Sequence, residues 1–234
     1  GGLKPELVER LVAKAREKAA VTVSGVAAPK PPAPATVGKP DPEVTPVTAP
    51  SKGISGPAAV DAARAHTAAA VKAGAWGPSQ LSNLTDYATD YSLDLNRELR
   101  AGREPADLPE RDMRDIVRDL DAGFAETPPL AEPVQTFRGI RFASPADVSK
   151  FVAGLKPGGD YSDPGYVSTS FDSKVAADFL RGKPGVVMHV TARRGVEMAG
   201  MGLKAGVTQT EAEFLLPRGQ RFKVLGVEPG ATGS

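Results

Sequence analysis

The sequence contains no cysteine and only two histidines, His66 and His189. The absence of cysteine excludes disulfide frameworks, cysteine-based zinc sites and thiol nucleophiles. The scarcity of histidine excludes a histidine-rich metal site and leaves only two candidates for a serine-histidine-aspartate triad. His189 lies in an apolar run and His66 in an alanine-rich segment. We therefore expect His189 to be a core or cross-strand residue, His66 to be solvated, and no metal to be bound.

An excess of charge of one sign is also missing, because 29 Lys and Arg residues face 28 Asp and Glu residues. Proteins that bind nucleic acids or anionic membrane surfaces usually carry a basic excess. No apolar run approaches the roughly 18 residues that a membrane span needs, and no secretory signal pattern is visible. We therefore expect neither a nucleic-acid partner nor a membrane partner. The chain starts Gly-Gly rather than with Met, which we interpret as a processed or excised piece or a cloning remnant.

Residues 1–56 differ in composition from the rest of the chain. Nothing before Trp76 is aromatic, and prolines cluster between residues 29 and 50. Such a stretch buries too little apolar surface to offset its ordering entropy, so we expect a disordered, partly polyproline-II linker. Ahead of it, the apolar spacing over residues 5–20 predicts a short amphipathic helix. We expect this helix to end an upstream domain or to dock on an assembly partner.

Residues 57–234 are expected to form the folded domain. Apolar residues at helical spacing predict three helices, over residues 58–72, 81–100 and 109–122. The pattern then changes, and it predicts strands over 134–142, 165–171, 185–191, 213–216 and 222–227, with short helices over 145–155 and 174–180. Asp160 and Asp163 are expected to shape a turn before the second of these strands. Helices first and strands later indicate an α+β domain. The glycine-rich stretch 195–210, which also holds the apolar residues Met198, Met201 and Leu203, is expected to be a functional loop.

Two segments in the strand-rich part combine residue types that suit a binding site. Arg138 lies in an otherwise apolar strand, where a guanidinium is costly unless it is paired or aimed into a cleft. Its planar fork suits a phosphate or a carboxylate, and the alternative is a structural salt bridge. Ser168, Thr169 and Ser170 follow in a later strand, where Ser168 and Ser170 share one face. The alternative here is an ordinary polar edge strand.

A third segment places two carboxylates, Glu211 and Glu213, before an apolar run. At i and i+2 of an extended chain they share one face. Two close carboxylates raise each other's proton affinity, which suits acid-base or charge-stabilising chemistry. The alternative is a solvated strand end.

Together, in this order, the three segments resemble the mono-ADP-ribosyltransferases of the Arg-Ser-Glu class, which are bacterial toxin and phage-type enzymes that use NAD. The family pattern is an aromatic-Arg-Gly strand, then Ser-Thr-Ser, then Glu-x-Glu before an apolar strand. The resemblance covers about residues 57–227 and extends to further family positions: Tyr87, Tyr91, Asn96, Leu99 and Arg100 upstream, and Phe179 and Arg181 between the motifs. It implies an ADP-ribosyltransferase-like fold, in which a helical N-terminal half packs on a two-sheet β core around an NAD cleft.

The resemblance also implies roles in binding NAD. Arg138 would bind its phosphate or ribose, and the backbone at Gly139 would approach the nicotinamide amide. Thr169 and Ser170 would line the same site. Phe179 would cover the bound dinucleotide, and Arg181 would add a phosphate contact.

For catalysis, the resemblance implies that Ser168 hydrogen-bonds Glu213 and fixes its rotamer. Glu213 would bond the ribose 2′-hydroxyl and stabilise an oxocarbenium-like transition state. Glu211 would engage the acceptor, and in this family Glu at that position goes with arginine acceptors. We therefore expect transfer of ADP-ribose from NAD to an arginine of a target protein, with release of nicotinamide.

Two alternatives stay open at this point. One is an NAD glycohydrolase, in which water is the acceptor. The other is a catalytically inactive interaction module of a larger assembly, such as a phage virion. For an active enzyme we expect a secreted, injected or virion-delivered protein that works in the cytoplasm of a target cell.

Overall fold

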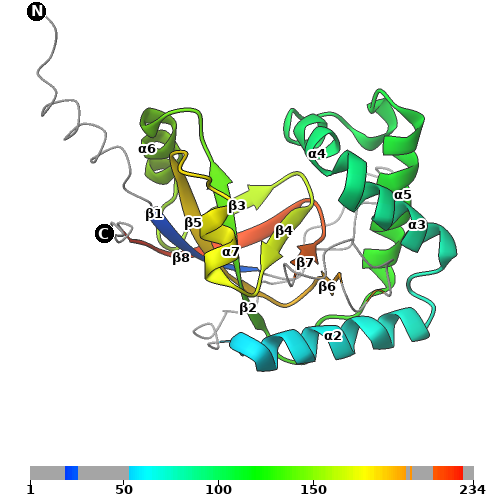
Figure 1. The fold of residues 1–234 in the computed structure, drawn as a ribbon. Coiled ribbons are helices and arrows are strands. Elements are labelled where there is room, and N and C mark those ends of the chain that lie inside the picture. Colours follow the sequence, from blue (N-terminus) through cyan, green and yellow to red (C-terminus); the bar gives the residue numbers. More distant parts are fainter. Residues whose placement is uncertain (1–18, 26–52, 199–200, 202–212, 229–234) are drawn as a thin grey trace, which may run out of the picture.

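The computed structural model describes residues 19–25, 53–198, 201 and 213–228 (Figure 1). Its strands follow the hydrogen-bonded order β3-β8-β1-β5-β2-β4-β7-β6, and a group of helices packs beside them. The predicted α+β class is confirmed. Most of the expected helix over residues 5–20 and most of the expected linker up to residue 56 lie outside the described residues.

The helical part follows the apolar spacing closely. It comprises α2 (Gly56–Lys72), α3 (Pro78–Asp86), a π-helical turn (Tyr87–Tyr91), α4 (Ser92–Arg100), a short 3-10 helix (Pro105–Asp107) and α5 (Arg111–Glu126). The predicted helix over 81–100 is thus interrupted by a π turn. The predicted end of the third helix before Gly123 is wrong, because α5 continues through that glycine to Glu126.

The strand-rich part contains the predicted strands and two short ones that the sequence did not reveal. The expected elements are β2 (Val134–Arg141), α6 (Pro145–Gly154), β4 (Val167–Ser170), α7 (Ser173–Asp178), β5 (Gly185–Ala192), β7 (Glu213–Leu216) and β8 (Gln220–Glu228). The unexpected ones are β3 (Asp160–Asp163) and β6 (Val196–Glu197), where turns and a loop were predicted. Their brevity hides any alternation from a sequence reading.

The strands form two groups that meet at one point. Strand β2 pairs with β5 over its whole length, from Val134↔Ala192 to Arg141↔Gly185. Its pairing with β4 is limited to Phe137↔Ser170. The group β3-β8-β1-β5-β2 and the group β4-β7-β6 therefore diverge on either side of this pair, as expected for a two-sheet core.

Strand β1 (Ala19–Gly25) was not predicted at all. It lies between β8, to which it is antiparallel, and β5, to which it is parallel. The sequence analysis placed these residues at the end of a helix and the start of a linker. The run Val21-Thr22-Val23 has high β-propensity, but its surroundings rich in alanine and proline masked it. The domain boundary at residue 56 stays a prediction, and β1 shows that residues before it take part in the sheet.

Buried apolar side chains form two clusters. The first combines side chains of both strand groups with those of α2 and α6, and Val134, Val190 and Phe222 are among its members. The second joins α3, α4 and α5 to β6 and β7. Met198 and Met201, which the sequence analysis placed in a loop, belong to this second cluster and are 0% and 2% exposed, so their side chains are part of the core. Leu203 lies outside the described residues.

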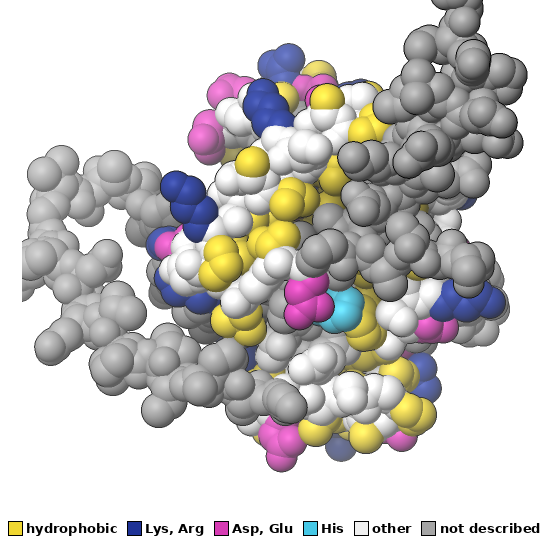
Figure 2. Space-filling model, turned by 90° about the vertical axis from the view of Figure 1, so that its left-hand side faces the viewer, with side chains coloured by type: hydrophobic (Ala, Val, Ile, Leu, Met, Phe, Trp, Pro, Cys, Tyr) yellow, Lys and Arg dark blue, Asp and Glu magenta, His cyan; other side chains and the backbone are white. Residues whose placement is uncertain are grey.

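The surface is mixed in charge. Figure 2 shows basic and acidic side chains interspersed around the rim of one face, with mainly uncharged side chains nearer its centre. Among the described residues, no helix combines the length and the apolar character that crossing a membrane requires.

Gly123 provides a test of the helical core. A Cβ added there would lie 2.8 Å from three ring atoms of Trp76, which also donates a 2.8 Å hydrogen bond to Thr127. We expect Gly123→Ala to lower the free energy of unfolding by about 1–3 kcal/mol, because the ring must move within a packed core. Urea denaturation measures this.

Gly154 is the matched control, because it is also helical and a Cβ there would meet nothing within 4 Å. Gly154→Ala should leave stability unchanged or raise it by up to about 1 kcal/mol. Equal effects of the two substitutions would contradict the packing described here.

Candidate active site

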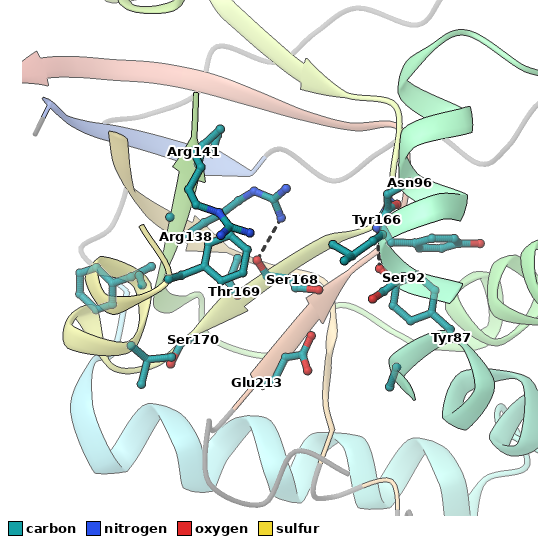
Figure 3. Close-up of a pocket in the computed structure, with 18 of the residues that line it drawn as sticks. Tyr87, Ser92, Asn96, Arg138, Arg141, Tyr166, Ser168, Thr169, Ser170 and Glu213 are labelled. Atoms are coloured by element: carbon teal, nitrogen blue, oxygen red, sulfur yellow. Dashed lines mark hydrogen bonds between the residues drawn. The ribbon is translucent and has the colours of Figure 1, made fainter. Parts of the chain in front are cut away.

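A cleft of about 480 Å³ lies where the two strand groups diverge (Figure 3). One wall is formed by residues 137–141 of β2, with Val175, Ala176 and Phe179 beside them. The opposite wall comes from the π turn and α4, and β4 and Glu213 of β7 lie between. Because β2 and β4 pair only at Phe137↔Ser170, residues 138–141 of β2 and residues 168–169 of β4 lie on the side of this pair where the two strands separate.

Arg138 is held on this β2 wall by two acceptors. Its Nη1 donates to the backbone oxygen of Ser168 at 3.0 Å, and its Nη2 donates to Oδ2 of Asp163 at 3.4 Å. Its Nε is buried and has no hydrogen-bond partner among the described residues. Both interpretations from the sequence are therefore realised in part, because Arg138 lines the cleft and also forms an ion pair.

The serines and Glu213 come together through strand register. Ser170 lies opposite Glu213, and Ser168 lies opposite Leu215 two positions along. In an antiparallel pair, Ser168 and Glu213 are thus diagonal neighbours on one face, within reach of a long side chain. Thr169 donates a 2.7 Å hydrogen bond to the backbone oxygen of Phe214 and so anchors β4 on β7.

Gly139 lines the cleft, but the structure gives a different reason for its glycine. A Cβ at this position would lie 2.2 Å from the backbone oxygen of Ala176. The absence of a side chain lets α7 pack directly on β2. Its contact with nicotinamide stays a prediction.

The structure brings most predicted site residues to this cleft. Arg138, Gly139, Ser168, Thr169, Ser170, Phe179 and Glu213 all line it. Arg181 does not: it is exposed, follows α7 and has a left-handed backbone with φ of 47°. Glu211 lies outside the described residues. The functional roles of all these residues stay predictions.

The side chain of Asn96 on the helical side bonds both a second helical side chain and the backbone just before β4. Asn96 donates to the hydroxyl of Tyr87 at 2.8 Å, and its Oδ1 accepts the backbone N–H of Tyr166 at 2.8 Å. Nine residues make about 2.5 turns of an α-helix, so an uninterrupted helix would place Tyr87 and Asn96 on opposite faces. The π turn at 87–91 absorbs the difference and turns both toward the cleft. Periodicity alone could not reveal this, and only the family resemblance singled these residues out.

The pKa of Tyr87 is shifted by its burial and by the charges around it. Burial raises the pKa of Tyr87 to about 12, and the Glu213 carboxylate contributes to the rise. Hydrogen bonds with Asn96 and Ser168, together with the charge of Arg138, act in the opposite direction. Tyr87 is therefore a neutral hydrogen-bonding group beside Ser168 and Glu213.

Arg141 was missed by the sequence analysis. Its guanidinium carbon lies 4.5 Å from the ring centroid of Phe179, which is 46% exposed at the edge of the cleft. A cation over an aromatic face is favourable, so this pair holds the Phe179 ring near the opening. The signal in the sequence is a second arginine at the end of the Arg138 strand, and no local pattern distinguishes it from a solvated charge.

Asp163 is the second residue whose part was missed. It was expected only to shape a turn, and Gly165 N–H does donate to its Oδ1 at 2.9 Å. Its carboxylate also accepts hydrogen bonds from the guanidinium groups of Arg100 and Arg138.

The structure agrees with the expectation for one histidine and not for the other. The ring of His189 packs on Phe137 across the strands, as predicted. His66 is half-buried rather than solvated, and burial lowers its pKa.

Comparison with known proteins places the chain in a family. The profile of the ADP-ribosyltransferase exoenzyme family matches residues 64–232. The chain belongs to this family, and the predicted resemblance is confirmed. NAD-dependent transfer of ADP-ribose is the family's reaction, and NAD is its substrate.

Solved structures share the fold. Exoenzyme S from Pseudomonas aeruginosa, in complex with human 14-3-3 protein beta and bound to Carba-NAD, is 24% identical with a TM-score of 0.54, covering 72% of this chain and 80% of that one. The C3 exoenzyme of Clostridium limosum is 22% identical with a TM-score of 0.51, covering 73% and 86%. C3stau2 from S. aureus with NAD is 18% identical with a TM-score of 0.54, covering 75% and 90%. Among curated protein sequences, none matches the chain.

No metal site accompanies the cleft in the part of the chain that the structure describes. No group of three or more His, Cys, Asp or Glu side chains there is arranged to hold an ion.

The buried tyrosines predict a stability that depends on alkaline pH. Burial raises the pKa of Tyr87 and of Tyr161 to about 12, whereas an unfolded tyrosine ionises near pH 10. Because the folded pKa is the higher one, this stabilisation is complete below about pH 10 and is lost as the pH rises toward 12. We expect the urea midpoint to fall steeply over that window, together with a rise in tyrosinate absorbance. Tyr161→Phe should make the fall shallower, and an unchanged midpoint up to pH 12 would contradict the assignment.

Proposed function

We propose that the chain transfers ADP-ribose from NAD to arginine side chains of a target protein and releases nicotinamide. The observation that carries this proposal is one cleft in which a fixed guanidinium, a serine and a strand carboxylate meet: Arg138, Ser168 and Glu213. Family membership supports the transfer reaction. The arginine acceptor rests on the sequence, through Glu211.

The proposed reaction requires positive charge at one end of the cleft and negative charge at the other. NAD carries an anionic diphosphate, which Arg138 binds from the β2 wall. Loss of nicotinamide leaves an oxocarbenium-like ribose, and the carboxylate of Glu213 stabilises that positive charge. Ser168, its diagonal neighbour, limits the rotamers that Glu213 adopts. Phe179, held by Arg141, covers the opening and excludes water from the reacting centre.

The arginine acceptor is inferred from the carboxylate of Glu211. A guanidinium is a cation and a poor nucleophile until it is oriented and loses a proton. A carboxylate two residues before Glu213 can orient the guanidinium and take its proton, whereas a neutral amide cannot take the proton.

We propose that the protein reaches its target as a secreted or injected effector, with virion delivery as an alternative route.

The experiment follows two products at once. Labelled ADP-ribose is transferred from NAD to a cell lysate and to agmatine, a small guanidine, while free nicotinamide is measured. The parent chain is compared with Glu211→Gln and Glu213→Gln. Both substitutions remove one carboxylate and keep the side-chain size, so each serves as the other's control.

We expect the parent to label both acceptors. Glu213→Gln should lose transfer and nicotinamide release by about 100-fold or more, since it removes transition-state stabilisation. Glu211→Gln should lose transfer but keep nicotinamide release. Nicotinamide release without any labelled acceptor would favour NAD glycohydrolysis instead, and absence of NAD binding would favour an inactive interaction module.

A further inference from the structure

The carboxylate of Asp163 lies between the two arginines of the cleft wall. It is 3% exposed and ends strand β3. Its Oδ1 accepts from Nε of Arg100 at 2.8 Å, and its Oδ2 accepts from Nη2 of Arg100 at 3.1 Å. The same Oδ2 accepts from Nη2 of Arg138 at 3.4 Å. One buried carboxylate thus holds a residue of α4 and a residue of β2.

Each arginine is also held by a backbone carbonyl in β4 or directly before it. Arg138 donates from Nη1 to the oxygen of Ser168 at 3.0 Å, and Arg100 donates from Nη2 to the oxygen of Tyr166 at 3.4 Å. A planar guanidinium that is hydrogen-bonded at two points has a fixed orientation. Its remaining N–H groups therefore point in one direction, because the side chain is restricted to few rotamers.

The charges of this cluster do not cancel. Two guanidinium groups face one carboxylate, so the cluster carries one net positive charge on the cleft wall. Arg100 and Arg138 line the cleft, whereas Asp163 does not. Without Asp163, the two cations would repel each other and turn toward solvent. Asp163 can therefore influence a bound anion only through the arginines.

We infer that Asp163 is a positioning residue, which orients Arg100 and Arg138 so that both guanidinium groups bind the diphosphate of NAD. This inference rests on the proposed function, since it takes NAD as the ligand of the cleft. It predicts that loss of the Asp163 charge weakens NAD binding more than it slows the chemical step.

The test compares Asp163→Asn with Asp119→Asn. Asp119 is a matched buried carboxylate, 7% exposed, which accepts from Arg118 at 2.8 Å and from Asn83 at 2.7 Å between α5 and α3. None of these three residues lines the cleft. Both substitutions remove one buried charge beside an arginine, so both should destabilise the fold.

Four quantities are measured for each variant: the free energy of unfolding, the Kd of NAD by calorimetry, and KM and kcat of nicotinamide release. We expect Asp163→Asn to raise Kd and KM for NAD about 10-fold or more, through loss of a charge-assisted contact, with kcat changed less than about 3-fold. Asp119→Asn should leave all three kinetic and binding constants near those of the parent. An equal effect of the two variants on KM, or a fall confined to kcat, would overturn the inference.

A second variant applies if Asp163→Asn does not fold. Arg100→Lys keeps the charge but cannot bridge Asp163 and the Tyr166 carbonyl with one planar group. An NAD KM raised about 3-fold or more supports orientation as the role of the cluster, because a lysine supplies only a point charge. An unchanged KM overturns it. If the parent chain neither binds NAD nor releases nicotinamide, the proposed function fails before any variant is compared, and the inference falls with it.

Discussion

The ion pairs of Asp163 with Arg100 and Arg138 hold the helical part and the strand-rich part in one arrangement. A buried carboxylate is costly unless it is paired and hydrogen-bonded, so its partners must reach it for the fold to be stable. One partner comes from α4, the second from β2, and the third is the backbone N–H of Gly165. The requirement that stabilises Asp163 thus also brings two cations to the cleft wall. Structure and site depend on the same contacts.

The cleft forms where strands β2 and β4 stop pairing. Strands β2 and β4 share one register pair and then separate, and α7 packs closely on β2 because Gly139 has no side chain. The separated edges present Arg138 from one side and Ser168, Ser170 and Glu213 from the other. On the helical side, the π turn rotates Asn96 toward Tyr87, which lies beside Ser168. The cleft therefore presents positive charge from β2 on one side and negative charge from β7 on the other.

Sequence reasoning recovered the elements whose signals are local. The helix over α5 and the strand over β5 follow from apolar spacing. The association of Ser168 with Glu213 was implied only by the family resemblance, and strand register makes the two residues diagonal neighbours. It failed where the cause lies far away in the chain. The partner of Asp163 in α4 is 63 residues distant, and no local pattern distinguishes this aspartate from one that caps a turn. Strand β1 was lost among proline-rich neighbours, and Met198 and Met201 look like loop residues until the second core is assembled around them.

The most direct test of this account is the crystal structure of the Glu213→Gln variant with NAD bound, since that variant should bind the dinucleotide without cleaving it. We expect the diphosphate to lie within hydrogen-bond distance of both Arg100 and Arg138, and the nicotinamide ribose to lie beside residue 213. A dinucleotide bound elsewhere, or one whose diphosphate contacts neither arginine, would contradict the central claim.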